Sequence, residues 1–375
     1  MNIKSLLLGS AAALAVVSGA QAADAIVAAE PEPMEYVRVC DAYGTGYFYI
    51  PGTETCLRIG GRVRFDVQAA NSYYRNSDYG WGTNSRAELN VDTASDTEYG
   101  ALRTQIVARF DYNPRHDWDN GGANWDQRPS DGGFFADATR TRLIAANIQL
   151  AGFTIGLADS VYSSFIGGAG NVINDDVISY GPFELNQINY TYDAGNGFRA
   201  VIALEDDGQY KVDRNRSVWG GSRNASGYMV DVVAGASYTT GAFGFTVVGG
   251  YDESMDEGAI KARVDATFGN VNAFLMGGWN TDDKRGNKYA AWAGEWAVWG
   301  GLGAKFTDTL GGNLQVAYSD SYANDNVLAI AANVQWNPVQ NLLIQPEVTY
   351  TKWDNVGRGR SDDQWNGMIR FERQF

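Results

Sequence analysis

The carboxyl-terminal stretch Gln-Trp-Asn-Gly-Met-Ile-Arg-Phe-Glu-Arg-Gln-Phe, residues 364–375, alternates between apolar and polar side chains up to the last residue. Apart from Arg373, one parity is apolar and carries Trp365, Gly367, Ile369, Phe371 and Phe375. Successive side chains of a strand point to opposite faces, so the stretch predicts a strand with one apolar and one polar face. The apolar face would meet either the core of a soluble protein or lipid.

The first 22 residues have the features of an export signal. Lys4 supplies a positive start, residues 6–17 form a short apolar run, and Ala20-Gln21-Ala22 is a small-residue cleavage site. We therefore expect cleavage after Ala22. No later stretch has eighteen or more apolar residues, so we expect no transmembrane helix. The choice narrows to a secreted soluble protein or an outer-membrane barrel.

The charge and composition favour the barrel. Cleavage would remove one lysine and no acid, leaving 28 basic against 44 acidic side chains and a net charge of −16, which argues against nucleic acid as a partner. Aromatic residues make up 13% of the chain, with 45 glycines and only 8 prolines. Long strands with tight turns and aromatic girdles have such a composition, although a large soluble sandwich could share it.

A period-two pattern recurs along the whole chain and predicts sixteen strands. The clearest, residues 57–69, places six apolar or glycine residues against six polar or glycine residues. The sixteen segments are 57–69, 84–93, 100–112, 138–150, 153–160, 186–192, 198–205, 228–239, 243–251, 259–268, 271–280, 295–306, 313–320, 327–336, 341–351 and 364–375.

The connections between these segments alternate strictly between short and long. The short ones include 151–152 and 269–270, and the long ones include 113–137 and 161–185. An up-and-down bacterial barrel has this pattern, with short periplasmic turns and long extracellular loops, whereas a Greek-key sandwich does not. The sequence thus predicts an all-β fold, a 16-stranded antiparallel transmembrane β-barrel over residues 57–375. Both termini would be periplasmic, and so many strands would enclose an aqueous channel.

Two segments fit the alternation imperfectly. In 138–150, Arg140 and Arg142 share parity with apolar residues, which indicates either a β-bulge or an inward apolar patch beneath a folded loop. In 295–306, Trp299 falls on the inward parity without an evident reason.

The segment Tyr-Val-Arg-Val-Cys-Asp-Ala-Tyr-Gly at 36–44, continuing through Gly-Tyr-Phe-Tyr-Ile-Pro-Gly-Thr-Glu-Thr-Cys-Leu-Arg-Ile-Gly-Gly at 46–61, resembles the amino-terminal signature of alphaproteobacterial outer-membrane porins of the Rhizobium and Brucella type. The signal peptide, strand layout and terminal Phe375 extend the resemblance over the whole chain. It implies a homotrimeric general-diffusion porin whose third loop folds into the barrel. We therefore expect residues 161–185 to fold inward.

Cys40 and Cys56 are the only cysteines and follow an export signal. We expect them to form a disulfide, which would stabilise the fold by about 3 kcal/mol in the chain-entropy model. A metal-binding pair is the alternative, although the chain has a single histidine, His116. Residues 23–56 would then be a pinned periplasmic extension.

Arginines gather on the polar parity of the first predicted strands. Alongside Arg58, the candidates for the pore lining are Arg62, Arg64, Arg86, Arg103 and Arg109, with Arg140 and Arg142 on the fourth strand. Such charges would repel one another in a packed core, but a water-filled lumen tolerates them. Their candidate partners around the third loop are Asp159, Asp175, Asp176 and Glu184. We expect these groups either to set a transverse field at a pore constriction or to pin the loop to the wall.

We expect a passive, water-filled channel for small hydrophilic solutes and ions, with weak cation preference, in contact with outer-membrane lipid and lipopolysaccharide. The alternative is a surface-binding barrel, an adhesin or phage receptor, that uses its aromatic and acidic loops. An enzyme is not expected, because a triad would need His116 beside a nucleophile and no Gly-x-Ser-x-Gly motif occurs. We also expect no cofactor and no metal.

Overall fold

The computed structural model describes residues 38–70, 81–113, 139–206, 229–281, 287–321, 326–354 and 362–375. The chain divides into two compact units, Met1–Arg38 and Val39–Phe375, and the described residues lie almost wholly in the second. The expected signal peptide and His116 lie outside the described residues. Within the described part of the chain, no helix is long and apolar enough to cross a membrane.

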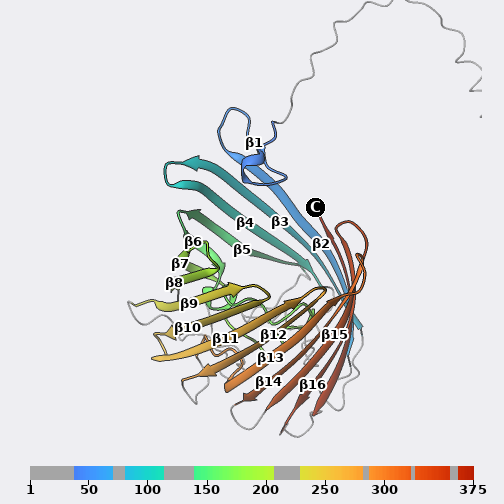
Figure 1. The fold of residues 1–375 in the computed structure, drawn as a ribbon. Coiled ribbons are helices and arrows are strands. Elements are labelled where there is room, and N and C mark those ends of the chain that lie inside the picture. The colour runs from blue at the N-terminus through green and yellow to red at the C-terminus, as the bar shows by residue number, and fades with distance from the viewer. Residues whose placement is uncertain are drawn as a thin grey trace, which may run out of the picture. The chain divides into compact units, whose positions relative to one another are not determined.

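Sixteen antiparallel strands form the wall of the second unit (Figure 1). They are β2 Cys56–Ala70, β3 Trp81–Thr97, β4 Gly100–Tyr112, β5 Thr139–Leu150, β6 Phe153–Asp159, β7 Glu184–Asp193, β8 Phe198–Glu205, β9 Asp231–Thr240, β10 Phe243–Asp252, β11 Glu257–Phe268, β12 Val271–Asn280, β13 Gly294–Lys305, β14 Leu310–Ser321, β15 Val327–Val339, β16 Leu342–Trp353 and β17 Asp363–Gln374.

The last strand closes the sheet into a barrel. β17 pairs with β2 along its length, with Phe371 opposite Phe65. Beyond β17, the backbone N–H and C=O of Phe375 exchange hydrogen bonds of 3.0 Å with Gly61. Closure removes the free sheet edges, so the backbone groups of the wall find partners within the wall. The predicted 16-stranded antiparallel barrel is confirmed.

The alternating pattern puts the apolar parity of each strand on the outer surface. Phe65 is 41% exposed and Trp365 54% exposed, although both are large and apolar. On the other parity, Arg64 and Glu372 are buried on the lumen side. Contact with water would be unfavourable for so many exposed apolar side chains, whereas contact with lipid is favourable.

One end of the barrel carries the short turns. The turn between β5 and β6 consists of Ala151 and Gly152, both with positive φ, 51° and 89°. This is the backbone combination of a two-residue hairpin whose twist matches the strands. A side chain at Gly152 would also meet the carbonyl oxygen of Thr191 at 2.8 Å. The strand ends that the long connections join lie at the other end.

A β-bulge explains the irregular pattern of 138–150. Val107 of β4 faces Ala145, and the next residue, Ala108, faces Leu143, so Ile144 has no register partner. The extra residue reverses the parity of β5. Arg140 and Arg142 before the bulge and Asn147 after it therefore all face the lumen. Of the two explanations that the sequence leaves open, the bulge is the one found.

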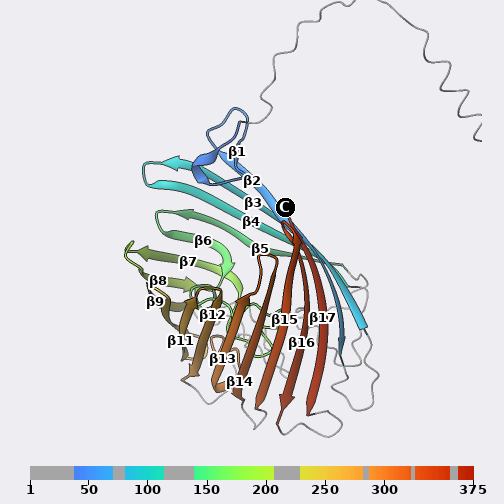
Figure 2. The same ribbon diagram turned by 45° about the vertical axis from the view of Figure 1, so that its right-hand side comes forward.

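Residues 39–56 form a small hairpin next to the start of the barrel wall. The hairpin contains a 3₁₀ turn, η1 Asp41–Tyr43, and a short strand, β1 Phe48–Tyr49, that pairs with the start of β2. The expected disulfide between Cys40 and Cys56 is present, with 6.1 Å between the Cα atoms. Figure 2 shows this blue segment at the end of the barrel where the C terminus lies.

Candidate functional site

The third loop leaves the wall unusually early. β6 is only seven residues long, and the chain turns inward at Ser160, which caps the helix α2 Val161–Ser164 through a hydrogen bond from the N–H of Tyr162 to its Oγ. Glu205 of β8 fixes this turn because its carboxylate accepts hydrogen bonds from Ser160 Oγ and from the N–H of Val161 at 2.8 Å. A carboxylate at a helix N-terminus satisfies amides that have no helical partner.

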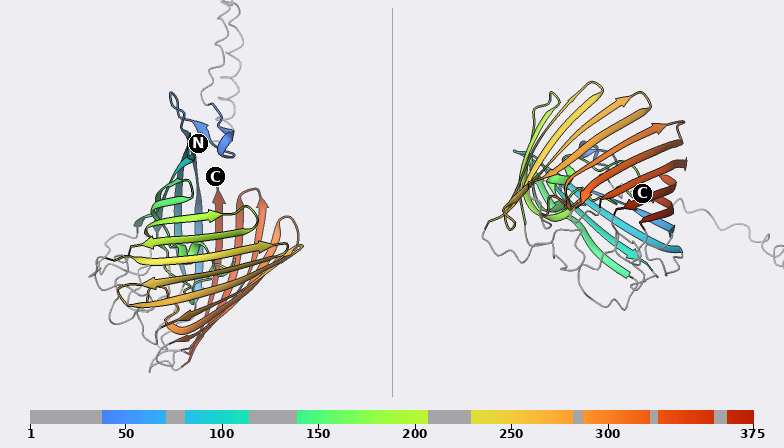
Figure 3. Two further views of the ribbon diagram at one scale, coloured as in Figure 1. Left: turned by 60° about the vertical axis from the view of Figure 1, so that its left-hand side comes forward. Right: turned by 90° about the horizontal axis from the view of Figure 1, so that it is seen from below.

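The loop then runs across the inside of the barrel (Figure 3). Inward side chains of the wall strands hold it. Lys261 of β11 donates from its buried side-chain nitrogen Nζ to the carbonyl of Tyr180. Trp299 of β13 donates its indole N–H to the carbonyl of Ile178 at 2.9 Å. These bonds satisfy backbone acceptors that the loop would otherwise bury unpaired.

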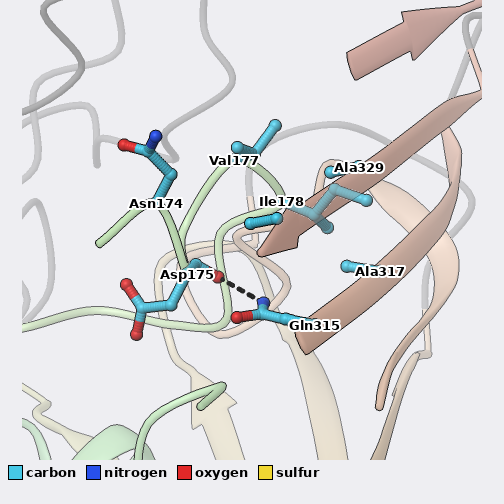
Figure 4. A pocket seen from close by; sticks show the side chains of 8 residues that line it. Asn174, Asp175, Val177, Ile178, Gln315, Ala317 and Ala329 are labelled. Carbon is cyan, nitrogen blue, oxygen red and sulfur yellow. Dashed lines mark hydrogen bonds between the residues drawn. The ribbon is translucent and has the colours of Figure 1, made fainter. Parts of the chain in front are cut away.

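The far end of the loop is attached to β14, β15 and β16. Gln315 donates to the carbonyl of Asp175 at 3.0 Å (Figure 4). The carboxylate of Glu347 accepts hydrogen bonds from the N–H groups of Ile173 and Asn174, the latter at 2.8 Å. Asn333 donates to the same carboxylate at 3.0 Å. The loop thus spans the lumen from β6 to β16, and the predicted inward fold is confirmed.

Small side chains on the wall make room for the loop. Val177 and Ile178 pack over Ala317, Ala329 and Ala331, in a contact that leaves no room for a water molecule (Figure 4). The wall alanines and the loop residue Ile178 are buried. This apolar contact holds the loop by packing as well as by hydrogen bonds.

A second inward segment, residues 287–292, packs against the inner wall beside α2. The Tyr289 ring lies over Gly250, where an added Cβ would approach the ring to 2.5 Å. The Trp292 ring lies over Gly278 in the same way, and an added Cβ there would approach it to 2.8 Å. The hydroxyl of Tyr289 donates to Glu205 at 2.9 Å, and its ring contacts Tyr162 at 5.0 Å. Glu205 therefore joins both inward segments.

Strands β2 to β5 carry a cluster that we name the arginine ladder. It consists of Arg62, Arg64, Arg86, Arg109, Arg140 and Arg142 on β2 to β5. Cross-strand register arranges these residues with acids in two rows, Glu372, Arg64, Arg86, Asp111 and Arg140 in one, and Arg62, Glu88, Arg109 and Arg142 in the next.

Acids of the wall itself supply most of the counter-charges. Arg86 pairs with Asp111 at 2.6 Å, and Glu88 pairs with both Arg62 and Arg109 at 2.9 Å. Arg64 lies 3.4 Å from Glu372. These acids offset the repulsion between neighbouring guanidinium groups, such as those of Arg64 and Arg86. The partners predicted from the sequence were acids around the third loop, and the wall acids were not among them, although their parity marks them as inward.

The acids that the sequence predicts around the third loop lie in two separate places. Glu184, at the start of β7, pairs with Arg142 at 2.9 Å, and Asp159 lies opposite Glu184 in the sheet register. Asp175 lies farther along the loop, where its carboxylate accepts a hydrogen bond from Tyr180 at 2.9 Å in place of a wall arginine. An arginine partner for the half-buried Asp176 stays a prediction.

Two of the candidate arginines are not part of the ladder. The guanidinium of Arg58 lies 5.0 Å from the ring of Tyr47, and that of Arg103 lies 5.5 Å from the ring of Tyr43. Both rings belong to the amino-terminal hairpin.

Burial raises the pKa of the Asp175 carboxyl to about 8, and the charge of the adjacent Asp176 adds to this effect. The same burial, together with the charge of Asp175, raises the pKa of the Tyr180 phenol. Asp175 is therefore mostly protonated at neutral pH, so the loop carries less negative charge than its sequence suggests.

The strand order around the barrel puts the ladder on the β17 and β2 to β5 wall and the loop contacts on the β8 to β16 wall. The interior between them is lined by charged and amide side chains. The sequence of residues 24–371 matches the family model described as "Porin subfamily". The chain belongs to this porin family.

Relatives and solved structures agree with this membership. The porin is 44% identical to "Porin Omp2b" of Brucella suis and 44% identical to "Porin Omp2a" of Brucella melitensis, with 100% of each chain covered. In fold it is similar to the outer membrane channel DcaP of Acinetobacter baumannii, with a TM-score of 0.63 at 13% identity over 87% of this chain and 99% of that one. It is also similar to the trimer form of the outer membrane protein OmpT of Vibrio cholerae, with a TM-score of 0.56 at 11% identity over 86% and 100%.

This porin is a general outer-membrane channel. Family membership implies a channel rather than an enzyme, and the barrel interior acts through its width and its charges. The residues that hold the loop were not predicted from the sequence; they are chiefly Glu205, Lys261, Trp299 and Glu347. Their only sequence signal is a polar, charged or indole-bearing side chain on the inward parity of a strand.

Proposed function

We propose that the arginine ladder and the third loop together form the constriction of the channel and act as its charge filter. The members of the proposed constriction are Arg62, Arg64, Arg86, Arg109, Arg140 and Arg142 on one side, with Glu184 and Asp159 next to Arg142, and the loop residues Asp175 and Asp176 on the other. The observation that carries the proposal is the division of the barrel interior, in which the ladder faces a loop attached to β8 through β16.

The ladder side carries cations and the loop side carries the charge of Asp176, to which Asp175 adds as the pH rises, so a transverse field crosses the passage between them. Arg62 and Arg142 are the ladder members best placed to act on a solute, since both keep 27% of their side-chain surface exposed. Wall acids compensate much of the ladder, and the expected mature chain carries −16. We therefore propose weak cation preference that fades as salt rises, because screening shortens the reach of exposed charges.

We further propose that the short turns lie in the periplasm and the long loops outside the cell, the usual arrangement of such barrels. Residues 1–22 would be removed after Ala22, residues 23–56 would form a periplasmic extension, and residues 57–375 would form the barrel. The apolar outer face would contact outer-membrane lipid and lipopolysaccharide. A homotrimer is proposed on the strength of the shared fold with the trimeric OmpT form.

The reversal potential in a salt gradient tests the charge filter. Asp175→Asn with Asp176→Asn should shift it toward anions, and Arg62→Gln with Arg142→Gln should shift it toward cations. Arg373→Gln is the matched control, because this arginine lies on the outward parity and donates to the carbonyl of Gln340 at the short-turn end. Equal reversal potentials in wild type and both double variants would show that neither set of charges lies in the path.

A further inference from the structure

The amino-terminal hairpin packs on the lumen side of the barrel wall. Cys56 of β2 and Ala94 of β3 share parity with the ladder arginines, so both point inward. Both are buried together with Tyr47 and Cys40 of the hairpin, and the partly buried Tyr43 and Tyr49 pack against this cluster. The hairpin therefore lines the inner surface of β2 and β3 at the short-turn end, rather than hanging from the outer rim.

Its two tyrosines hold two inward arginines. Arg58 stacks on Tyr47 and pairs with Asp92 at 2.8 Å, while 46% of its side-chain surface stays exposed. Arg103 stacks on Tyr43, and no carboxylate among the described residues forms an ion pair with it. A cation over an aromatic face keeps its full charge, because the ring attracts it without neutralising it. The short-turn mouth thus has a cation with no ion-pair partner among the described residues, unlike Arg62, Arg86, Arg109 and Arg142 of the ladder.

Tyr43 is itself fixed in position. Its hydroxyl forms a hydrogen bond with Asp96 near the turn between β3 and β4, and its ring stands at 63° to that of Tyr47, 6.3 Å away. The disulfide between Cys40 and Cys56 closes the hairpin around both rings. The arrangement is built from several side chains, so the orientation of Arg103 does not depend on one contact.

We propose that the disulfide-closed hairpin, with Tyr43 and Tyr47 presenting Arg103 and Arg58, is a second charge filter in series with the constriction. It would act at the periplasmic mouth and attract anionic solutes and anions there. The inference depends on the channel function alone and not on the role of the third loop.

A fixed charge at one mouth makes conduction depend on the direction of the current. The concentration of mobile ions near Arg103 follows its potential, which extends about one Debye length, roughly 10 Å at about 0.1 M salt and 3 Å at about 1 M. Removal of one charge that lies within several ångströms of the path should change the local ion concentration by a factor of about 1.5 to 2 at the lower salt.

The test is the ratio of single-channel currents at equal and opposite voltages in KCl. We expect Arg103→Gln to change this ratio by a factor of about 1.5 at about 0.1 M and to leave it unchanged at about 1 M. Tyr43→Leu, which removes the ring but keeps the arginine, should change it in the same direction, whereas Tyr43→Phe should behave as wild type. Resistance of each barrel to unfolding by SDS confirms that the variant has folded.

Arg373→Gln is the matched control, since it removes one positive charge from the outer surface at the same end. Equal current ratios in wild type and Arg103→Gln at the lower salt would overturn the proposal. An equally large change in Arg373→Gln would overturn it as well, because the effect would then not come from the lumen. A changed reversal potential without a changed current ratio would assign Arg103 to the constriction instead.

Discussion

The buried indole of Trp299 donates its N–H to the carbonyl oxygen of Ile178 at 2.9 Å, which ties the middle of the third loop to β13. This contact explains an aromatic side chain on the inward parity of a strand. It also shows that the loop is held by specific contacts on the wall and not only by its two ends.

Trp299→Phe should lower the free energy of unfolding by about 1–3 kcal/mol, because the carbonyl of Ile178 loses its donor while it stays buried. Trp299→Ala should cost about 3–5 kcal/mol, because it also leaves a cavity. Denaturant titration in lipid or detergent measures both. Trp296→Phe, on the same strand but 41% exposed on the outer face, is the control and should change stability much less. A Trp299→Phe protein as stable as wild type would contradict the account.

Gly250→Ala tests how the second inward segment, residues 287–292, packs against the wall. The added methyl group would lie 2.5 Å from the ring of Tyr289, so the segment must move, at a cost of about 1–3 kcal/mol. Gly249→Ala is a neighbouring control that faces the other way, where the nearest atom, on Ile260, is 3.8 Å from the new Cβ. Thermal unfolding of the two variants should therefore differ. Equal melting temperatures would show that Tyr289 does not occupy this position.

Selectivity should depend on pH through Asp175. Its pKa is raised to about 8 by burial and by Asp176, so the carboxyl gains its charge only as the pH rises through that value. Cation preference should then increase between pH 7 and 9, and Asp175→Asn should abolish the increase. Reversal potentials at the two pH values measure it, with Asp308→Asn, in an exposed turn, as the control. A pH response that persists in Asp175→Asn would assign the titration to another group.

The raised pKa of Asp175 also predicts that the stability of the protein depends on pH. Because the folded state holds the proton of Asp175 up to about pH 8 and the unfolded chain releases it near pH 4, the folded state binds more protons between these values. The contribution of Asp175 to stability is therefore complete at low pH and is lost as the pH rises toward 8. Asp175→Asn should flatten this part of the stability profile, as measured by denaturant titration at several pH values.

The wall of the barrel could be predicted from the sequence because each strand carries its own signal. In β17, the alternation from Trp365 to Phe371 records directly which face meets lipid and which meets the lumen. The same parity identifies Arg86 and Asp111 as inward side chains. Local alternation could not decide how β5 resumes its pattern, because the bulge at Ile144 is visible only through pairing with β4.

The contacts between the third loop and the wall could not be predicted from the sequence in this way. Glu347 meets Asn174 across 173 positions of sequence, and nothing near either residue indicates the other. Arg103 resembles the ladder arginines in parity, yet its height in the wall brings it to Tyr43 at the mouth. Parity gives the face of a side chain, but its partner depends on height and on long-range packing.

The central claim is that ions pass through the barrel beside the arginine ladder. Single-channel recording of Arg142→Cys in a planar bilayer, before and after a bulky water-soluble thiol reagent, tests it most directly, because the two native cysteines are joined in a disulfide. We predict stepwise conductance that falls when the reagent reacts, while Arg373→Cys on the outer face keeps its full step. Folded protein that gives no steps, or steps that the reagent leaves unchanged at position 142, would contradict the account.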